Sequence, residues 1–243
     1  MFRPCFLVPT YNNKTVIEQT LDRLAREGMP ILLVDDGSEP ETGAFLQTLP
    51  AKRDYLQVKR LEVNGGKGAA VKAGLVWADE LGYTHALQVD ADGQHQIDDV
   101  PKFMEVARTQ PNTLVLGCPV FGEDVPSARL HGRKISQFWV NIETLSGAIR
   151  DPLFGFRVYP VPVAAALIRR QPMGSRMDFD PEIAVRLYWE GLEVHNIPTP
   201  VIYPEGGVSH FQMIRDNIRI SWMHTRLVFG MLLRFPRLLR RKR

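Results

Sequence analysis

Short runs of β-branched and aliphatic residues alternate with longer helical stretches through the first half of the chain. The expected strands, each with the helix that follows it, are residues 6–8 and 16–25, 31–34 and 42–49, 56–63 and 69–81, 86–89 and 100–107, and then 114–116. Strands of this length separated by helices are typical of βαβ units, which build a mostly parallel sheet. The sequence therefore predicts an α/β fold.

Polar clusters follow each of the first four apolar runs. They are Pro9-Thr10-Tyr11-Asn12-Asn13, Asp35-Asp36-Gly37-Ser38, Asn64-Gly65-Gly66-Lys67-Gly68 and Asp90-Ala91-Asp92-Gly93-Gln94-His95. Ligands of open parallel sheets bind outside the carboxyl ends of the strands, so we expect these clusters to meet at one sheet edge. Each cluster alone would also suit a helix cap or a turn. Their recurrence in one register predicts a binding site.

The second half of the chain is less regular, and it contains no internal repeat and no linker. The expected elements are helices over residues 131–149 and 180–189, strands over 154–159, 194–197 and 201–203, and one or two helices over 213–239. We expect one domain over residues 1–212, in which the second half closes over the site. A helical tail over residues 213–243 follows it.

Composition excludes several classes of protein. The chain is 44% apolar and 23% charged, with 19 Gly and 18 Pro, which excludes disordered and collagen-like chains. Its two cysteines, Cys5 and Cys118, provide neither a disulfide framework nor a metal knuckle. The N-terminus lacks a basic stretch followed by an apolar run and a cleavage site. A cytoplasmic location is therefore the default expectation.

The net charge of +3 conceals a basic tail. From Arg215 onward, nine Lys or Arg residues stand against the single acid Asp216, so the tail carries +8 and the rest of the chain −5. Apolar residues recur there at helical spacing, but basic residues interrupt them, and no run is long enough to span a membrane. The pattern predicts a basic amphipathic helix that either packs on the domain or lies on an anionic membrane. No nucleic-acid recognition fold accompanies it.

Asp90 and Asp92 place two carboxylates on the same side of an extended segment. Together with Gln94 they offer the hard oxygen ligands that Mg²⁺ and Mn²⁺ prefer. The Gly-rich loop that opens a helix at residues 64–70 lets the backbone approach a phosphate, and Lys67 offsets the phosphate charge. The loop has neither the Walker spacing nor the dinucleotide fingerprint. ATPase and dehydrogenase activities are therefore not expected.

These four clusters and the segment Asp151-Pro152-Leu153-Phe154-Gly155-Phe156-Arg157 occur in the order typical of glycosyltransferase family 2. The chain most resembles its branch of polyprenyl-phosphate and dolichol-phosphate sugar synthases. The resemblance covers residues 5–100 and, with fewer matches, 130–205. It implies a GT-A fold and inverting, metal-dependent transfer of a sugar from a nucleotide diphosphate sugar to a lipid-linked or lipid-like acceptor.

The resemblance also implies roles for donor-binding residues. Pro9, Tyr11 and Asp36 would line the nucleoside pocket, with Asp36 facing the base. Lys67 would lie near the base or the phosphates. Asp90 would approach the ribose or the metal.

Further residues would hold the diphosphate and its metal. By the same resemblance, Asp92, together with Gln94, would hold the divalent ion that bridges the diphosphate, and Arg157 would contact phosphate. His210 stands where the related synthases often carry Ser-Lys, and it would bind the diphosphate or complete the metal shell. The alternative for His210 is an ordinary solvated or hydrogen-bonded histidine.

Two carboxylates are candidates for the catalytic base on the acceptor side. Asp151 matches the family segment there, and Asp180 lies with Asp178 and Glu182 in a second acidic cluster. We favour Asp180 if the acceptor is a hydroxyl, whereas a phosphate acceptor is already an anion and needs no strong base. The alternative for Asp180 is a cap on the helix that Pro181 begins.

The sequence thus predicts a cytoplasmic glycosyltransferase bound peripherally to the inner face of the membrane. One alternative is a nucleotidyltransferase, which normally carries a Gly-rich basic loop directly after its first strand, where this chain has Pro9-Thr10-Tyr11. Another alternative is a catalytically silent module that binds a nucleotide sugar or a membrane. The intact Asp36, Asp90 and Asp92 argue against the silent module.

Overall fold

The computed structural model describes residues 1–121, 127–201 and 213–241, and the side chains of 127–129 and 213–214 are outside the description. Its described strands form one sheet in the order β3-β2-β1-β4-β6-β5-β7. The strands are β1 (Pro4–Thr10), β2 (Ile31–Asp35), β3 (Leu56–Arg60), β4 (His85–Gln88), β5 (Thr113–Val120), β6 (Arg157–Pro160) and β7 (Glu193–Pro200). The helices are α1 (Ile17–Ala25), α2 (Pro40–Thr48), α3 (Lys67–Glu80), α4 (Val100–Thr109), α5 (Ser127–Thr144), α6 (Val161–Arg170), α7 (Phe179–Trp189) and α8 (Met213–Arg241).

Most strand pairs are parallel, as the sequence predicts. Strands β3, β2, β1 and β4 run parallel to one another, and β7 is parallel to β5. Only β6 runs against its neighbours β4 and β5 among the strands described here. The first four strands therefore bring their carboxyl ends, and the polar clusters that follow them, to one edge.

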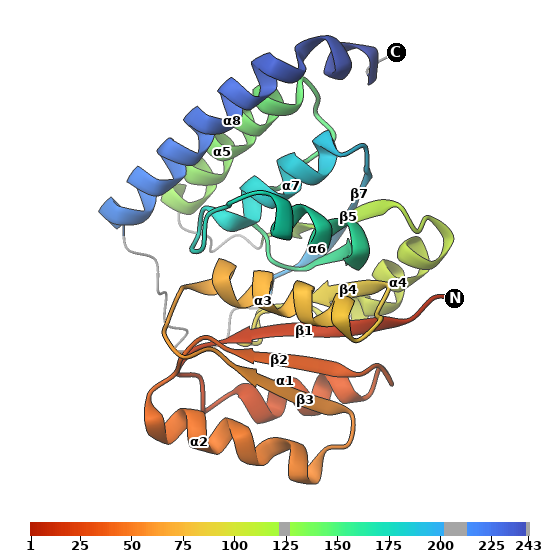
Figure 1. The fold of residues 1–243 in the computed structure, drawn as a ribbon, viewed down its shortest axis with the longest axis vertical. Helices are drawn as coiled ribbons and strands as arrows, with labels where there is room; N and C mark the ends of the chain where they lie inside the picture. The colour runs from red at the N-terminus through yellow and green to blue at the C-terminus, as the bar shows by residue number, and fades with distance from the viewer. Residues whose placement is uncertain (122–126, 202–212, 242–243) are drawn as a thin grey trace.

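Helices cover both faces of the sheet (Figure 1). Alternate residues of β1 point to opposite faces. Cys5 and Leu7 belong to a core built with α3, α6 and α7, whereas Phe6 and Val8 belong to a second core built with α1, α2 and α4. Burial on both faces explains why the strands read as continuous apolar runs without polar alternation.

Several element boundaries differ from the predicted ones. The helix expected over 131–149 ends at Thr144, because Leu145 adopts a left-handed backbone conformation with φ of 49°. β6 begins only at Arg157. The strand expected over 194–197 is present as the longer strand β7. Of the strand expected over 201–203, the structure describes only Val201, which forms an isolated bridge with His95. Helix α6 was not predicted, although Pro162 in its first turn is a helix-start signal.

The tail forms one helix, α8, which packs on the rest of the protein. Its inner face buries Met223, Leu227, Met231 and Leu238. Figure 1 shows α8 beside α5 and α7, and α8 has residue contacts with both helices. In the part of the chain that the structure describes, no helix is long and apolar enough to cross a membrane.

Candidate active site

Asp36 shapes the Gly-rich loop. It follows β2 and is only 2% exposed. Its carboxylate accepts hydrogen bonds from the backbone N–H groups of Gly65 (3.0 Å) and Gly66 (2.7 Å) and from Asn64 Nδ2 (3.0 Å). Burial raises the pKa of Asp36, and the two backbone hydrogen bonds only partly oppose this rise. The predicted contact between Asp36 and a nucleoside base stays a prediction.

Two glycines allow this loop to pass close to its neighbours. Gly37 has φ of 67°, and a Cβ there would lie 2.6 Å from the backbone nitrogen of Asn64. Gly66 has φ of 93°, and a Cβ there would lie 2.8 Å from the Ser175 carbonyl oxygen. Only glycine combines this backbone conformation with the small space, so the loop conformation requires both residues.

Lys67 is the first residue of α3 and lies between two carboxylates. Its Nζ is 2.9 Å from the Asp90 carboxylate and 3.0 Å from Asp180 Oδ2. Burial alone would raise the pKa of Asp90, but Lys67 and His95 lower it to about 2. Burial alone would lower the pKa of Lys67, but Asp180 and Asp90 hold it above its ordinary value. Asp90 and Lys67 therefore stay ionised at neutral pH.

Asp92 and Gln94 lie together after β4. Asp92 Oδ1 accepts a hydrogen bond from the Gln94 backbone N–H at 3.0 Å. Burial and the nearby charge of Asp90 raise the pKa of Asp92. Among the residues the structure describes, no three His, Cys, Asp or Glu side chains gather to hold a metal ion. The predicted third ligand, His210, lies outside the described residues.

Arg157 lies in the protein interior, and its predicted contact with phosphate stays a prediction. Its side chain is fully buried at 0% exposure. The guanidinium donates hydrogen bonds to three carbonyl oxygens, those of Phe154 (2.6 Å), Pro152 (3.1 Å) and Asp180 (2.8 Å). Because these carbonyls engage its donors in the interior, Arg157 joins the segment after Asp151 to the start of α7.

The two candidate bases have different surroundings. Asp151 Oδ1 accepts hydrogen bonds from the backbone N–H groups of Leu153 and Phe154, both at 2.9 Å, and its Oδ2 lies 2.5 Å from Arg133. Asp180 is 6% exposed, and its Oδ1 has no hydrogen-bond partner among the described residues. The interpretation of Asp180 as a helix cap is wrong, because α7 begins at Phe179 and the cap position belongs to Asp178.

Two predicted nucleoside contacts lie at the same sheet edge. Pro9 is buried in β1 and pairs with Val34 of β2. Tyr11 follows the strand and is 36% exposed. The adjoining Asp36 N–H donates to the Thr10 carbonyl at 2.8 Å, which holds the ends of β1 and β2 together.

His95 belongs to the site but was not predicted to. It is 2% exposed and packs against the rings of Phe154 and Phe156, each with centroids at 4.9 Å. Its Nδ1 accepts the Asp90 backbone N–H at 3.2 Å. Burial lowers the pKa of His95 to about 4, although Asp90 raises it, so the ring is neutral at pH 7. In the sequence, only the proximity of His95 to Asp90 and Asp92 could have indicated that this residue belongs to the site.

A segment just before α7 also reaches the site. The Ala69 N–H donates to the Ser175 carbonyl at 2.9 Å, and Lys72 Nζ donates to Ser175 Oγ at 2.8 Å. A Cβ on Gly68 would lie 2.4 Å from Phe179 Cβ, so α3 and α7 touch here without a gap. These residues are about a hundred positions apart, and no local sequence signal could have indicated the contact.

Comparison with known proteins identifies the family. Residues 5–173 match the family model of glycosyl transferase family 2. The chain is 28% identical over 218 residues to the undecaprenyl-phosphate mannosyltransferase of Micrococcus luteus, covering 84% of this chain and 85% of that protein. It is also 28% identical to the polyprenol monophosphomannose synthase of Mycolicibacterium smegmatis, covering 89% of this chain and 83% of that protein.

A solved structure shares the fold. The glucosyl-3-phosphoglycerate synthase of Mycobacterium tuberculosis, in complex with Mn²⁺ and UDP-glucose, superposes with a TM-score of 0.65. The match has 14% sequence identity and covers 96% of this chain and 78% of that chain. This likeness supports the predicted GT-A fold.

The chain belongs to glycosyl transferase family 2, and it is a glycosyltransferase with a GT-A fold. The predicted resemblance to the polyprenyl-phosphate sugar synthases is confirmed by the two bacterial relatives. Neither the nucleotidyltransferase nor the silent-module alternative gains support from these comparisons.

The Lys67 ion pairs predict a specific dependence of stability on pH. The pKa of Asp90 is about 2 in the folded protein, against an ordinary value of 3.8. A depressed carboxylate pKa stabilises the fold above the ordinary value, and this contribution is lost as pH falls towards 2. In Lys67→Met, Asp90 loses its cation, so the contribution should be absent.

Urea unfolding of both proteins between pH 7 and pH 2 measures this contribution. We expect the difference in free energy of unfolding to be largest at neutral pH and to shrink below pH 4. A constant difference across this range would contradict the assigned ion pairs.

Proposed function

We propose that the protein transfers a sugar from a nucleotide diphosphate sugar to a lipid phosphate, with inversion and with Mg²⁺ or Mn²⁺. The observation that carries this proposal is the meeting of Lys67, Asp90 and Asp180 beside the Gly-rich loop. The names of the two bacterial relatives support a polyprenyl-phosphate acceptor. The Mn²⁺ and UDP-glucose in the mycobacterial structure support the donor class and a divalent metal.

The diphosphate of the donor would lie at the Gly-rich loop. The loop ends at the N-terminus of α3, where the helix dipole favours an anion. Lys67 stands at this terminus and supplies a positive charge. Pro9, Tyr11 and Asp36 adjoin the loop and would line the nucleoside pocket.

The divalent ion would be held by Asp92, with Gln94 and Asp90 nearby. These groups fit Mg²⁺ or Mn²⁺ because carboxylate and amide oxygens are hard ligands. A bound cation would offset both the burial and the charge of Asp90, which together raise the pKa of Asp92. When bound, the ion stabilises the charge that develops on the leaving diphosphate. The contribution of His210 to the metal shell stays a prediction.

Replacing Asp92 with Asn tests donor and metal binding together. Wild-type protein should bind a nucleotide diphosphate sugar in the presence of Mn²⁺, measured by calorimetry with UDP- and GDP-sugars. Asp92→Asn should weaken this binding about tenfold or more, because one negative metal ligand is lost. Removal of Mn²⁺ with a chelator should have the same effect on the wild type.

Asp98→Asn is the matched control. Asp98 lies six residues after Asp92 on the same segment, and its side chain is exposed. This variant should bind the donor as the wild type does. Equal donor affinity of Asp92→Asn and Asp98→Asn would remove Asp92 from the metal site.

Asp180 is our proposed catalytic carboxylate on the acceptor side. Both oxygens of Asp151 are engaged by backbone N–H groups and Arg133, so Asp151 is the weaker candidate. Asp180 keeps one oxygen without a partner among the described residues. An acceptor phosphate, with a second pKa of about 6, carries a proton mainly in acid. Asp180 would accept that proton or orient the attacking oxygen.

Asp180→Asn should lower the turnover number about a hundredfold and leave donor affinity within about twofold. The loss should be greater at pH 5.5 than at pH 8, because more of the acceptor phosphate is protonated there. The measurement is sugar transfer to a short polyprenyl phosphate in detergent at both pH values.

Asp178→Asn serves as the control on the same segment, and Asp151→Asn tests the alternative base. A full transfer rate in Asp180→Asn, with a lowered rate in Asp151→Asn, would exchange the two assignments.

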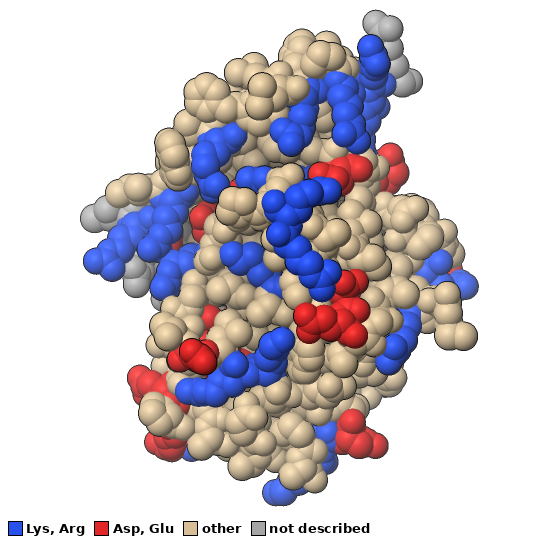
Figure 2. Space-filling model, in the orientation of Figure 1, with Lys and Arg blue, Asp and Glu red and all other residues tan. Residues whose placement is uncertain are grey.

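The outer face of α8 is our proposed membrane contact. It exposes Ile218 (64%), Trp222 (62%), Phe229 (65%) and Leu233 (84%), which share one side of the helix. The exposed side chains of Arg215, Arg237 and Arg240 accompany them. Figure 2 shows Lys and Arg along the upper part of the molecule, where α8 lies. Aromatic and aliphatic residues beside arginines suit the interface of an anionic bilayer.

Vesicle binding tests this face. Wild-type protein should bind vesicles that contain phosphatidylglycerol, and Trp222→Ala should weaken binding about tenfold because one aromatic side chain no longer enters the interface. Arg237→Gln should also weaken it, whereas Arg26→Gln, an exposed arginine of the α1 end, should not. Co-sedimentation at low and high salt measures these affinities. Unchanged vesicle binding in Trp222→Ala would show that the outer face of α8 is not the membrane contact.

A further inference from the structure

Glu182 is a fully buried carboxylate of α7 that the proposed chemistry does not use. Its Oε1 accepts hydrogen bonds from Arg186 at 2.7 and 3.0 Å. Its Oε2 accepts the Gly174 backbone N–H at 2.8 Å and Arg226 of α8 at 3.3 Å. A buried charge is stable only when partners surround it, so Glu182 fixes the positions of the groups that donate to it.

One of these groups, Gly174, begins the segment that supports the Gly-rich loop. The next residue, Ser175, accepts the Ala69 N–H through its carbonyl. Lys72 of α3 donates to the Met173 carbonyl at 3.2 Å as well as to the Ser175 hydroxyl. Ser175 also packs closely against the loop, because a Cβ on Gly66 would lie 2.8 Å from the Ser175 carbonyl oxygen. A shift of this segment would therefore shift the loop.

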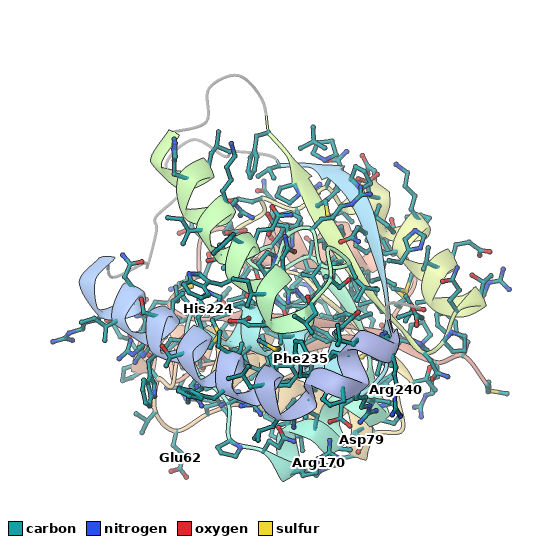
Figure 3. The ribbon with its side chains drawn as sticks, turned by 90° about the horizontal axis from the view of Figure 1, so that it is seen from above. Glu62, Asp79, Arg170, His224, Phe235 and Arg240 are labelled. Atoms are coloured by element: carbon teal, nitrogen blue, oxygen red, sulfur yellow. The ribbon has the colours of Figure 1, made fainter. Side chains whose placement is uncertain are left out.

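Another group, Arg226, belongs to a helix that is itself anchored. His224 of α8 pairs with the buried Glu143 of α5 at 2.7 Å, and Trp189 of α7 donates to the Glu143 carbonyl at 2.9 Å. Arg234 lies over the Trp189 ring at 4.7 Å. Figure 3 shows His224 on the side of α8 that faces α5. Polar contacts thus lock α5, α7 and α8 together.

We propose that Glu182 is a positioning residue that couples α8 to the Gly-rich loop. Contacts run from Arg226 to Glu182, from Glu182 to Gly174, and from Ser175 to Ala69 in the first turn of α3, which follows the loop. The C-terminal helix thereby holds the donor site in shape as well as facing outward. The inference rests on the proposed function only in taking this loop as the donor site.

The test uses the full chain with two substitutions, Glu182→Gln and Arg226→Met. In the unliganded proteins, amide hydrogen exchange at residues 65–69 and 174–176 should become about tenfold faster in both variants. Amides of β1 and β2 should keep their wild-type rates, which excludes general destabilisation. The dissociation constant for the donor with Mn²⁺ should rise about tenfold, with a smaller change in turnover at saturating donor.

Two further variants make the result specific. Arg226→Lys keeps a cation near Glu182 and should restore most of the protection. Glu190→Gln breaks an ion pair with Arg170 of α6 (2.8 Å) at the C-terminal end of α7, and should change neither measurement. Arg226 is 34% exposed, so Arg226→Met carries the test if Glu182→Gln fails to fold.

Wild-type exchange in both segments of Arg226→Met would overturn the coupling, whatever the donor measurement gives. If the variants exchange faster but the wild-type protein binds no nucleotide sugar, the coupling would be supported and the proposed donor site would be overturned. The two proposals therefore fail in distinguishable ways.

Discussion

The site depends on one shared cation, Lys67, which holds together carboxylates from the two halves of the chain. Asp90 comes from the end of β4 and Asp180 from the first turn of α7, and the Lys67 ammonium lies within 3.0 Å of both. Removal of this charge would leave two buried or half-buried carboxylates facing each other, which is costly in a poorly solvated site. Arg157 also stabilises the contact between the two halves of the chain, because its guanidinium donates a hydrogen bond to the Asp180 carbonyl. The second half of the chain closes over the sheet edge through these contacts.

The charges around Lys67 are balanced only in part. Asp90 is compensated by Lys67, whereas burial and Asp90 both raise the pKa of Asp92. A site that keeps an incompletely compensated carboxylate beside a helix N-terminus favours a divalent cation together with an anionic ligand. This arrangement agrees with catalysis by charge stabilisation on a leaving diphosphate. It also explains why Asp92, and not Asp90, is our choice of metal ligand.

Helix α8 has two apolar faces with different surroundings. Met223, Leu227 and Met231 pack into the core, whereas Trp222 and Leu233 lie exposed on the opposite side. A helix that serves only to complete a core has no need for large exposed apolar side chains beside arginines. The sequence left packing on the domain and contact with a membrane as alternatives. The structure shows that α8 packs on the domain, and its exposed outer face remains available for contact with a membrane.

The sequence by itself determined the α/β class, the parallel strands and the sheet edge with the four polar clusters, because apolar periodicity and the residues after each strand are local signals. The sequence also indicated the family, because the motifs that the family shares are short and occur in a fixed order along the chain. Tertiary structure decided which groups surround Arg157, His95 and Glu182. The sequence predicted only a phosphate contact for Arg157, whereas the structure shows its guanidinium bound to carbonyls from segments more than twenty residues apart. Such contacts depend on which distant segments meet, and no local pattern encodes that meeting.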